Sequence, residues 1–199
     1  MKKIIRALII LLVGVTASAA VPDTYVKEYL GLPASMPFDG STYTLSWSSH
    51  PSPNFYKQEY TVKGDNIENY KKMILVDVLT GNQSIRNIVD MKVAELKGMK
   101  ASNPHVDYTT TEESGETVLD FIITANAADG KTISIAERNI YRYKKFVTAA
   151  GKTGIILFGT STRAYGTACG DFIKAIKANR RNLTDKFVRV KIPDLTINQ

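Results

Sequence analysis

The sequence predicts an α+β fold, in which one antiparallel β-sheet of about six to seven strands is flanked by two main helices in an α/β/α sandwich. Three observations predict this class. Segments with strand periodicity follow one another across short turns, two segments have helical periodicity, and each helical segment comes after a run of strands. Short turns between consecutive strands imply antiparallel pairing, because a parallel pair needs a long crossover.

Strand signals recur along the chain as alternating apolar and polar residues or as short apolar runs. The densest runs, 72–79 and 154–162, are expected inside the sheet. Glycine marks the turns at Ser114-Gly115 and Asp129-Gly130, because it adopts positive φ without strain. The Ser- and Pro-rich stretch 46–54 is expected to be a loop. The predicted strands are 43–47, 55–63, 72–79, 105–112, 116–125, 131–146 and 154–162.

Two segments have an apolar face at helical spacing. Ser84 is expected to cap the first helix, and Asn103-Pro104 ends it. The second helix is predicted over 168–182. The tail 187–195 alternates and is predicted to add a short edge strand. The apolar faces are Ile85, Ile88, Val89, Val93, Leu96 and Met99 in the first helix, and Ala168, Cys169, Phe172, Ile173 and Ile176 in the second.

The first twenty residues have the three-part pattern of a cleavable secretory signal. Lys2, Lys3 and Arg6 precede the uncharged run 7–15, and small residues at 17–20 offer a cleavage site. A membrane-spanning helix needs about 20 apolar residues, far more than this run provides. We therefore expect residues 1–20 to be removed and 21–199 to form a single α+β domain. The expected location is the periplasm or the medium, with no transmembrane segment in the mature chain.

Composition and charge are ordinary for a globular protein. Removing the signal with its three positive charges lowers the formal net charge from +7 to +4. This mild basicity favours solubility and does not indicate nucleic-acid binding. The single cysteine, Cys169, cannot form an intramolecular disulfide, and its apolar neighbours at helical spacing predict that it is buried.

The order of elements resembles that of a known fold. Three strands, a helix, four strands and a closing helix directly after the run GIILFGTSTRAYG are similar to PsbP-like domains. The resemblance covers about residues 43–181 and rests on element order. It implies an α-β-α sandwich, often exported, that serves scaffolding, assembly or binding rather than one chemistry.

The candidate site lies in the segment 137–145 of a long predicted strand. Side chains two apart share a face of a strand, so this segment carries polar and tyrosine residues on one face and a basic strip on the other. Tyrosine and arginine are enriched at interaction hot spots. The alternative is a long edge strand that its charges protect against aggregation. The predicted ligand- or partner-binding residues are Glu137, Arg138, Asn139, Tyr141, Arg142 and Tyr143, and Lys144 extends the basic strip.

Catalytic, metal-binding and cofactor-binding motifs do not emerge from the sequence, so no catalytic residue, metal or cofactor is predicted. His50 and His105 are the two histidines, and they lack metal-ligand spacing. We therefore favour an exported, non-enzymatic binding or assembly protein. Its expected partner is an envelope or secreted protein or a small ligand. The alternatives are an immunity or inhibitor protein against a secreted toxin and a small envelope hydrolase with a non-standard site.

Overall fold

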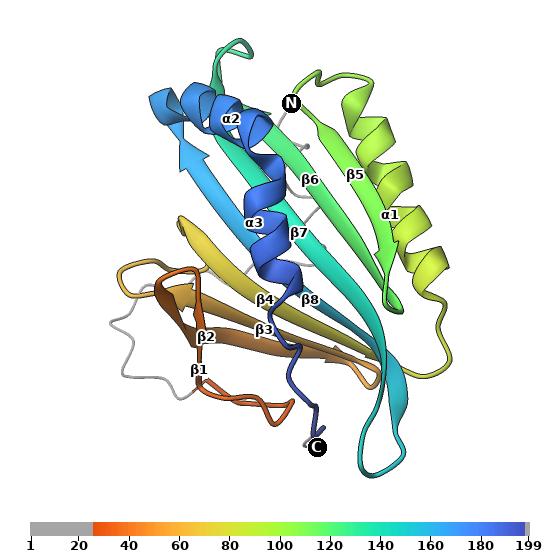
Figure 1. Cartoon of the computed structure of the whole chain (residues 1–199). Helices are drawn as coiled ribbons and strands as arrows, with labels where there is room; N and C mark the ends of the chain where they lie inside the picture. The colour runs from red at the N-terminus through yellow and green to blue at the C-terminus, as the bar shows by residue number, and fades with distance from the viewer. Residues whose placement is uncertain (1–25, 198–199) are drawn as a thin grey trace.

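The computed structural model describes residues 26–197, and the predicted signal segment lies outside them. Eight strands form one antiparallel sheet in the order β1-β2-β3-β4-β8-β7-β6-β5 (Figure 1). Helix α1 connects β4, in the middle of the sheet, to β5 at its far edge. The strands then return to the middle by short turns. The strands are β1 (Ser35–Phe38), β2 (Ser41–Ser52), β3 (Phe55–Val62), β4 (Lys72–Thr80), β5 (Asp107–Glu113), β6 (Glu116–Asn126), β7 (Ile133–Val147) and β8 (Thr153–Tyr165).

The predicted α+β class and antiparallel sheet are confirmed, but the predicted count of six to seven strands is wrong. The additional strand is β1, which has only four residues and includes a proline. It pairs with β2 across a two-residue turn at Asp39-Gly40, where both residues have positive φ, 44° and 72°. Asp-Gly is a favoured pair for such a turn, so the weak signal came from the strand itself, which is too short to show alternation.

The predicted loop at 46–54 is also wrong, because β2 continues to Ser52 and only Pro53-Asn54 forms the turn to β3. The pairing of β2 with β3 shifts register between Ser49 and Ser52, where Pro51 lacks an N–H for the ladder. A second shift lies between Leu45 and Trp47. These two register shifts allow serine and proline residues that are typical of loops to lie within β2.

The second predicted helix is two helices, α2 (Cys169–Ala178) and α3 (Arg180–Val188), which follow the short 3-10 helix η2 (Gly166–Ala168). The chain bends at Asn179, whose φ and ψ of −141° and 44° are not helical. The predicted edge strand at 187–195 is therefore wrong: its first residues end α3. The tail beyond them has no regular secondary structure and packs Ile192 and Leu195 into the core.

Helix α1 (Ile85–Lys100) packs on one face of the sheet, against β5, β6 and β7. We call this side the α1 face. The Ser84 hydroxyl accepts a hydrogen bond from the backbone N–H of Asn87, which confirms the predicted cap. Val89 and Leu96 are the fully buried side chains of the helix, and they lie among Leu119, Phe121 and Tyr141 of the sheet.

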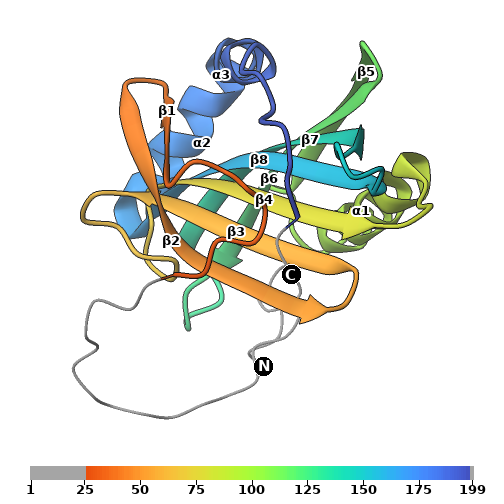
Figure 2. The same ribbon diagram turned by 90° about the horizontal axis from the view of Figure 1, so that it is seen from below.

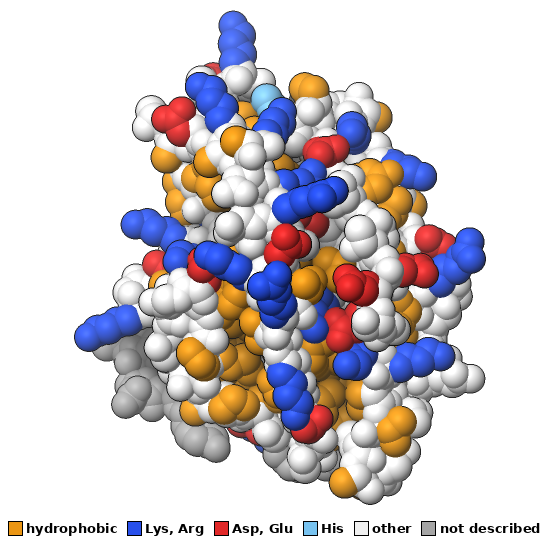
Figure 3. All heavy atoms as spheres, viewed as in Figure 1, with side chains coloured by type: hydrophobic (Ala, Val, Ile, Leu, Met, Phe, Trp, Pro, Cys, Tyr) orange, Lys and Arg blue, Asp and Glu red, His pale blue; other side chains and the backbone are white. Residues whose placement is uncertain are grey.

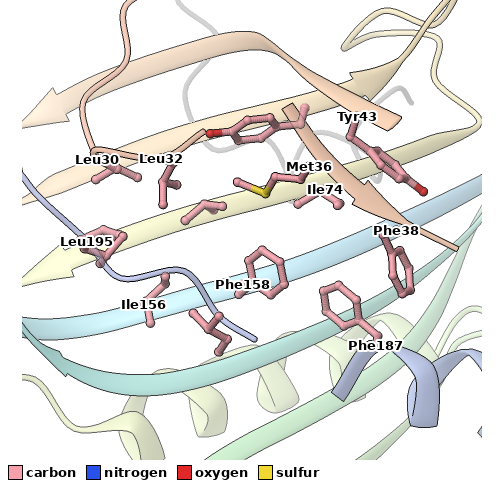
Figure 4. Close-up of a cluster of buried hydrophobic side chains, with 14 of the residues drawn as sticks. Leu30, Leu32, Met36, Phe38, Tyr43, Ile74, Ile156, Phe158, Phe187 and Leu195 are labelled. Carbon is pink, nitrogen blue, oxygen red and sulfur yellow. The ribbon is translucent and has the colours of Figure 1, made fainter. Parts of the chain in front are cut away.

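Helices α2 and α3 and the tail pack on the opposite side, the α3 face. Figure 2 shows β1 and β2 curling up from the sheet towards α3. Phe187 of α3 is fully buried there, stacked on Phe158 with ring centroids 5.1 Å apart and edge-on to Phe38 (Figure 4). This aromatic contact joins β1, β8 and α3 in the main core.

The segment before β1 and the C-terminal tail lie side by side over the α3 face. The backbone N–H of Thr196 donates to the carbonyl of Leu30 at 2.9 Å. Gly31 has φ +67°, and a Cβ there would lie 2.7 Å from the Cβ of Thr196, so only glycine permits this approach. On this face, hydrophobic side chains remain visible among side chains of both charges (Figure 3).

Cys169 is 1% exposed in the small cluster beneath α2, which confirms its predicted burial. Burial raises the pKa of its thiol, so it is a weak nucleophile. Within residues 26–197, none of the helices combines the length and apolar character that crossing a membrane requires.

Candidate functional site

The six candidate residues of β7 divide between the two faces of the sheet, as their alternation predicts. However, β7 lies inside the sheet between β6 and β8, so the edge-strand alternative is wrong. Arg138 and Arg142 are each 4% exposed, so the expected exposed basic strip is also wrong for these two arginines. The reason is that α3 and the tail cover this part of the α3 face.

Arg138 holds the first turn of α3 on the sheet. Its guanidinium pairs with the carboxylate of Asp120 on β6, with Nη2 2.8 Å from Oδ2. The same group donates to the backbone carbonyl of Arg180 and to the hydroxyl of Thr184. Thr184 in turn donates to Asp120, which closes a buried network between β6, β7 and α3.

Arg142 holds the other end of α3. Its Nη1 donates to the carbonyls of Phe187 and Val190, at 2.9 and 2.6 Å, where the helix leaves carbonyls without intrahelical partners. Its Nε and Nη2 pair with Glu116 of β6 at 2.9 and 2.8 Å. Both arginines therefore fix the docking of α3, and neither offers its charge to a partner.

On the α1 face, Glu137 is the centre of a second buried network. It accepts hydrogen bonds from the Tyr70 hydroxyl at 3.0 Å and from Asn139 at 2.8 Å, and it pairs with Arg163. The Arg163 guanidinium lies 4.0 Å from the centroid of the Tyr70 ring. Because Tyr70 belongs to the β3–β4 connection, Glu137 and Asn139 anchor this connection to the sheet.

Tyr141 and Tyr143 lie beside this network. They are 9% and 2% exposed, and burial raises the pKa of both phenols, which therefore stay neutral. Gly159 of β8 leaves the space in which Tyr141 meets Leu75 of β4: a Cβ there would lie 2.9 Å from Cδ1 of Tyr141 and 3.0 Å from Cγ of Leu75. Tyr141 thus lies between the side chains beneath α1 and those of β4 on the same face of the sheet.

Beyond Tyr141, strands β2, β3 and β4 carry a half-buried group of side chains on the α1 face. Trp47 pairs with Glu59, and Glu59 pairs with Leu75, so the three side chains form a row across the strands. Lys57 pairs with Asp77 in the neighbouring row, with Nζ 3.1 Å from Oδ2. We call this group the Trp47–Glu59 patch; its residues are Trp47, Lys57, Glu59, Leu75 and Asp77.

The patch differs from a covered sheet face. Helix α1 packs against β5, β6 and β7, and in Figure 1 it lies beside β5, away from β2 and β3. Trp47, the single tryptophan of the chain, belongs to none of the three hydrophobic clusters that the described side chains form. Oδ1 of Asp77 is buried without a hydrogen-bond partner among residues 26–197. Buried polar atoms of this kind are uncommon in native proteins.

The carboxyl of Glu59 is expected to make stability depend on pH. Burial raises its pKa from 4.5 to about 7, because Trp47 and Leu75 on either side exclude water without hydrogen-bonding to the carboxylate in its place. Neutral Glu59 therefore contributes stability that is fully present below about pH 4.5 and is lost as the pH rises through about 7. We expect the urea midpoint to fall between pH 5 and pH 8 more steeply in the wild type than in Glu59→Gln.

Glu112→Gln is the matched control, because Glu112 is exposed at the end of β5. This variant should keep the wild-type dependence on pH. Equal pH slopes in the wild type and Glu59→Gln would show that Glu59 has an ordinary pKa.

A separate open groove of about 720 Å³ lies between the start of α1 and the β5–β6 hairpin. Its charged lining includes Arg86 and Lys145 as well as Glu112 and Glu113. Arg86 is already close to Asp90, and the glutamates are exposed at a hairpin tip. The groove therefore offers mixed surface charge rather than a converging set of polar groups.

The two histidines lie in different parts of the sheet. His50 is on β2, stacked on Tyr56 with ring centroids 4.0 Å apart, whereas His105 precedes β5 at the opposite edge. Residues 26–197 contain no group of three or more His, Cys, Asp or Glu side chains placed to hold a metal ion.

A protein-family model matches residues 30–192. The chain belongs to this family. The matched span begins just before β1 and ends in the C-terminal tail, so it contains every strand and helix described above. No curated protein and no solved structure matches the chain.

The Trp47–Glu59 patch is absent from the site predicted on the sequence. One signal for it was readable: Tyr56 and Tyr60 alternate with Lys57 and Glu59, so β3 has one apolar and one polar face. Trp47 was predicted to end the strand 43–47, but the register shift between Leu45 and Trp47, which places it opposite Glu59, could not be read from the sequence.

Proposed function

We propose that the protein is exported and binds another molecule without transforming it, with the Trp47–Glu59 patch as its binding surface. The observation that carries this proposal is the half-buried Trp47 directly opposite Glu59, whose carboxyl has no partner among residues 26–197, on the part of the sheet away from α1. Aromatic side chains with a few polar groups are typical of binding surfaces. The partner is an envelope or secreted protein or a small ligand.

The candidate residues on the α1 face have a supporting place in this proposal. Tyr141 contacts Leu75 above Gly159 and so forms the inner border of the patch. Glu137 and Asn139 anchor the β3–β4 connection through Tyr70, and Tyr143 is buried beside Tyr141. The likeness of the element order to PsbP-like domains fits an assembly or binding role and belongs to the same proposal.

Export is expected to remove the N-terminal segment. The charged, apolar and small-residue pattern of residues 1–20 supports cleavage that leaves Ala20 or Val21 as the first residue. Mass spectrometry of the protein recovered from the periplasm or the medium measures this directly. Recovery of the chain with Met1 in the membrane fraction would contradict export.

Binding is tested by capture from envelope extract with immobilised wild type, Trp47→Ala and Lys177→Ala. Lys177 is exposed on α2, on the other side of the sheet. A partner of the patch should be retained by Lys177→Ala and lost with Trp47→Ala, because truncating a hot-spot aromatic residue costs about 2 kcal/mol or more. Capture that depends on Lys177 and not on Trp47 would place binding elsewhere. A captured toxin would favour the inhibitor interpretation over an assembly role.

A further inference from the structure

The charges around the Trp47–Glu59 patch do not balance. Arg163 pairs with Glu137, and Lys57 pairs with Asp77. Among the described residues, the side chain of Glu59 has charged neighbours but no ion-pair or hydrogen-bond partner. Once Glu59 ionises, the half-buried patch has one negative charge without a partner. A buried or half-buried charge is costly unless it is paired.

Trp47 stands next to this carboxyl. The two residues are directly opposite in the β2–β3 pairing, so their side chains are on one face with Cβ atoms about 4.5–5.5 Å apart. Trp has the most favourable aromatic face for a cation. Leu75 on the other side of Glu59 adds apolar surface for an alkyl chain.

We propose that the Trp47–Glu59 patch binds an organic ammonium group, with the Glu59 carboxylate as its counter-charge and the Trp47 indole as its aromatic contact. This inference rests on the proposed function and names the ligand class. The ammonium group belongs either to a free amine or to a lysine side chain of a protein partner. Its alkyl chain lies along Leu75.

Binding of a cation to this patch depends on pH. The charged groups that face Glu59 are Lys57 on the same strand, Asp77 on β4, Arg163 on β8 and Glu137 on β7. The last two neutralise each other, and Lys57 is held by Asp77. Because burial raises the pKa of Glu59 to about 7, the site is charged above neutral pH and neutral in mild acid.

The mature protein is titrated at about pH 8 with n-butylammonium and, separately, with n-butanol and butyrate. Emission of Trp47 reports the site without ambiguity, because the chain has one tryptophan. We expect saturable binding of n-butylammonium, at least about tenfold tighter than that of n-butanol or butyrate. The same loss of about tenfold is expected for n-butylammonium with Glu59→Gln, since a hydrogen bond to a charged group contributes about 1.5–3 kcal/mol. Glu112→Gln should bind as the wild type does.

A second measurement does not depend on the Glu59 variant folding. Wild-type affinity for n-butylammonium should fall about tenfold or more between about pH 8 and about pH 5.5. A peptide with one lysine, compared with its acetylated form, separates the two sources of the cation. Tighter binding of the lysine peptide than of n-butylammonium indicates a protein partner, and equal binding indicates a free amine.

The inference is overturned if n-butylammonium does not bind at millimolar concentration, or if Glu59→Gln and mild acid leave its affinity unchanged. Binding of n-butanol at Trp47 with no preference for the ammonium ion would also overturn it. That last result would leave the proposed function standing, because the patch would still be a binding surface.

Discussion

Arg142→Ala is expected to lower the free energy of unfolding by about 3–5 kcal/mol, the range for removing one partner of a buried ion pair. The substitution leaves Glu116 without its closest cation and removes the side-chain donor from the carbonyls of Phe187 and Val190, of which the Phe187 carbonyl keeps the N–H of Val190. Helix α3 then loses its connection to the sheet at that end. Urea unfolding at neutral pH measures the effect.

Lys144→Ala is the matched control, because Lys144 pairs with the same glutamate at 3.2 Å but is 46% exposed. Exposed ion pairs contribute about 0–1 kcal/mol, so this variant should unfold nearly as the wild type does. If the two variants lost equal stability, Arg142 would not hold α3 on the sheet.

Phe187→Ala is expected to cost about 3–5 kcal/mol, as truncation of a fully buried aromatic side chain does. The cavity would open between Phe158 and Phe38 and would separate α3 from β1 and β8. Limited trypsin digestion should then cut within α3, at Arg181 or Lys186, faster than in the wild type.

Val147→Ala provides the comparison, because Val147 is 72% exposed and should change stability by less than about 0.5 kcal/mol. Unchanged stability and unchanged digestion of Phe187→Ala would mean that α3 is not part of the core.

The regular part of the fold was predictable from local patterns. The alternation in β7 placed Tyr141 and Tyr143 on one face and Arg138 and Arg142 on the other, as in the structure. Ser84 and the apolar face of α1 were likewise readable, because capping and helical spacing are local properties. Strand β1 was missed although its turn, Asp39-Gly40, has the same Asp-Gly pair as the predicted turn at Asp129-Gly130, because a four-residue strand that includes a proline has almost no alternating pattern of its own.

The candidate site was harder to predict because exposure is not local. Whether Arg138 and Arg142 face solvent depends on α3, and the break at Asn179 redirects this helix across them. The pairing of Trp47 with Glu59 depends on register across an irregular strand pair. Register is determined by pairing over the whole hairpin, and a sequence pattern read one segment at a time does not contain it.

Binding at the Trp47–Glu59 patch requires that Trp47 lie on an accessible, negatively charged surface of the mature protein. Quenching of its fluorescence tests this most directly, with acrylamide, caesium and iodide at equal ionic strength near pH 8. We expect efficient quenching by acrylamide and stronger quenching by caesium than by iodide, because at this pH Glu59 is ionised and no described residue pairs with it. Emission that resists all three quenchers, or that iodide quenches more strongly than caesium, would contradict it.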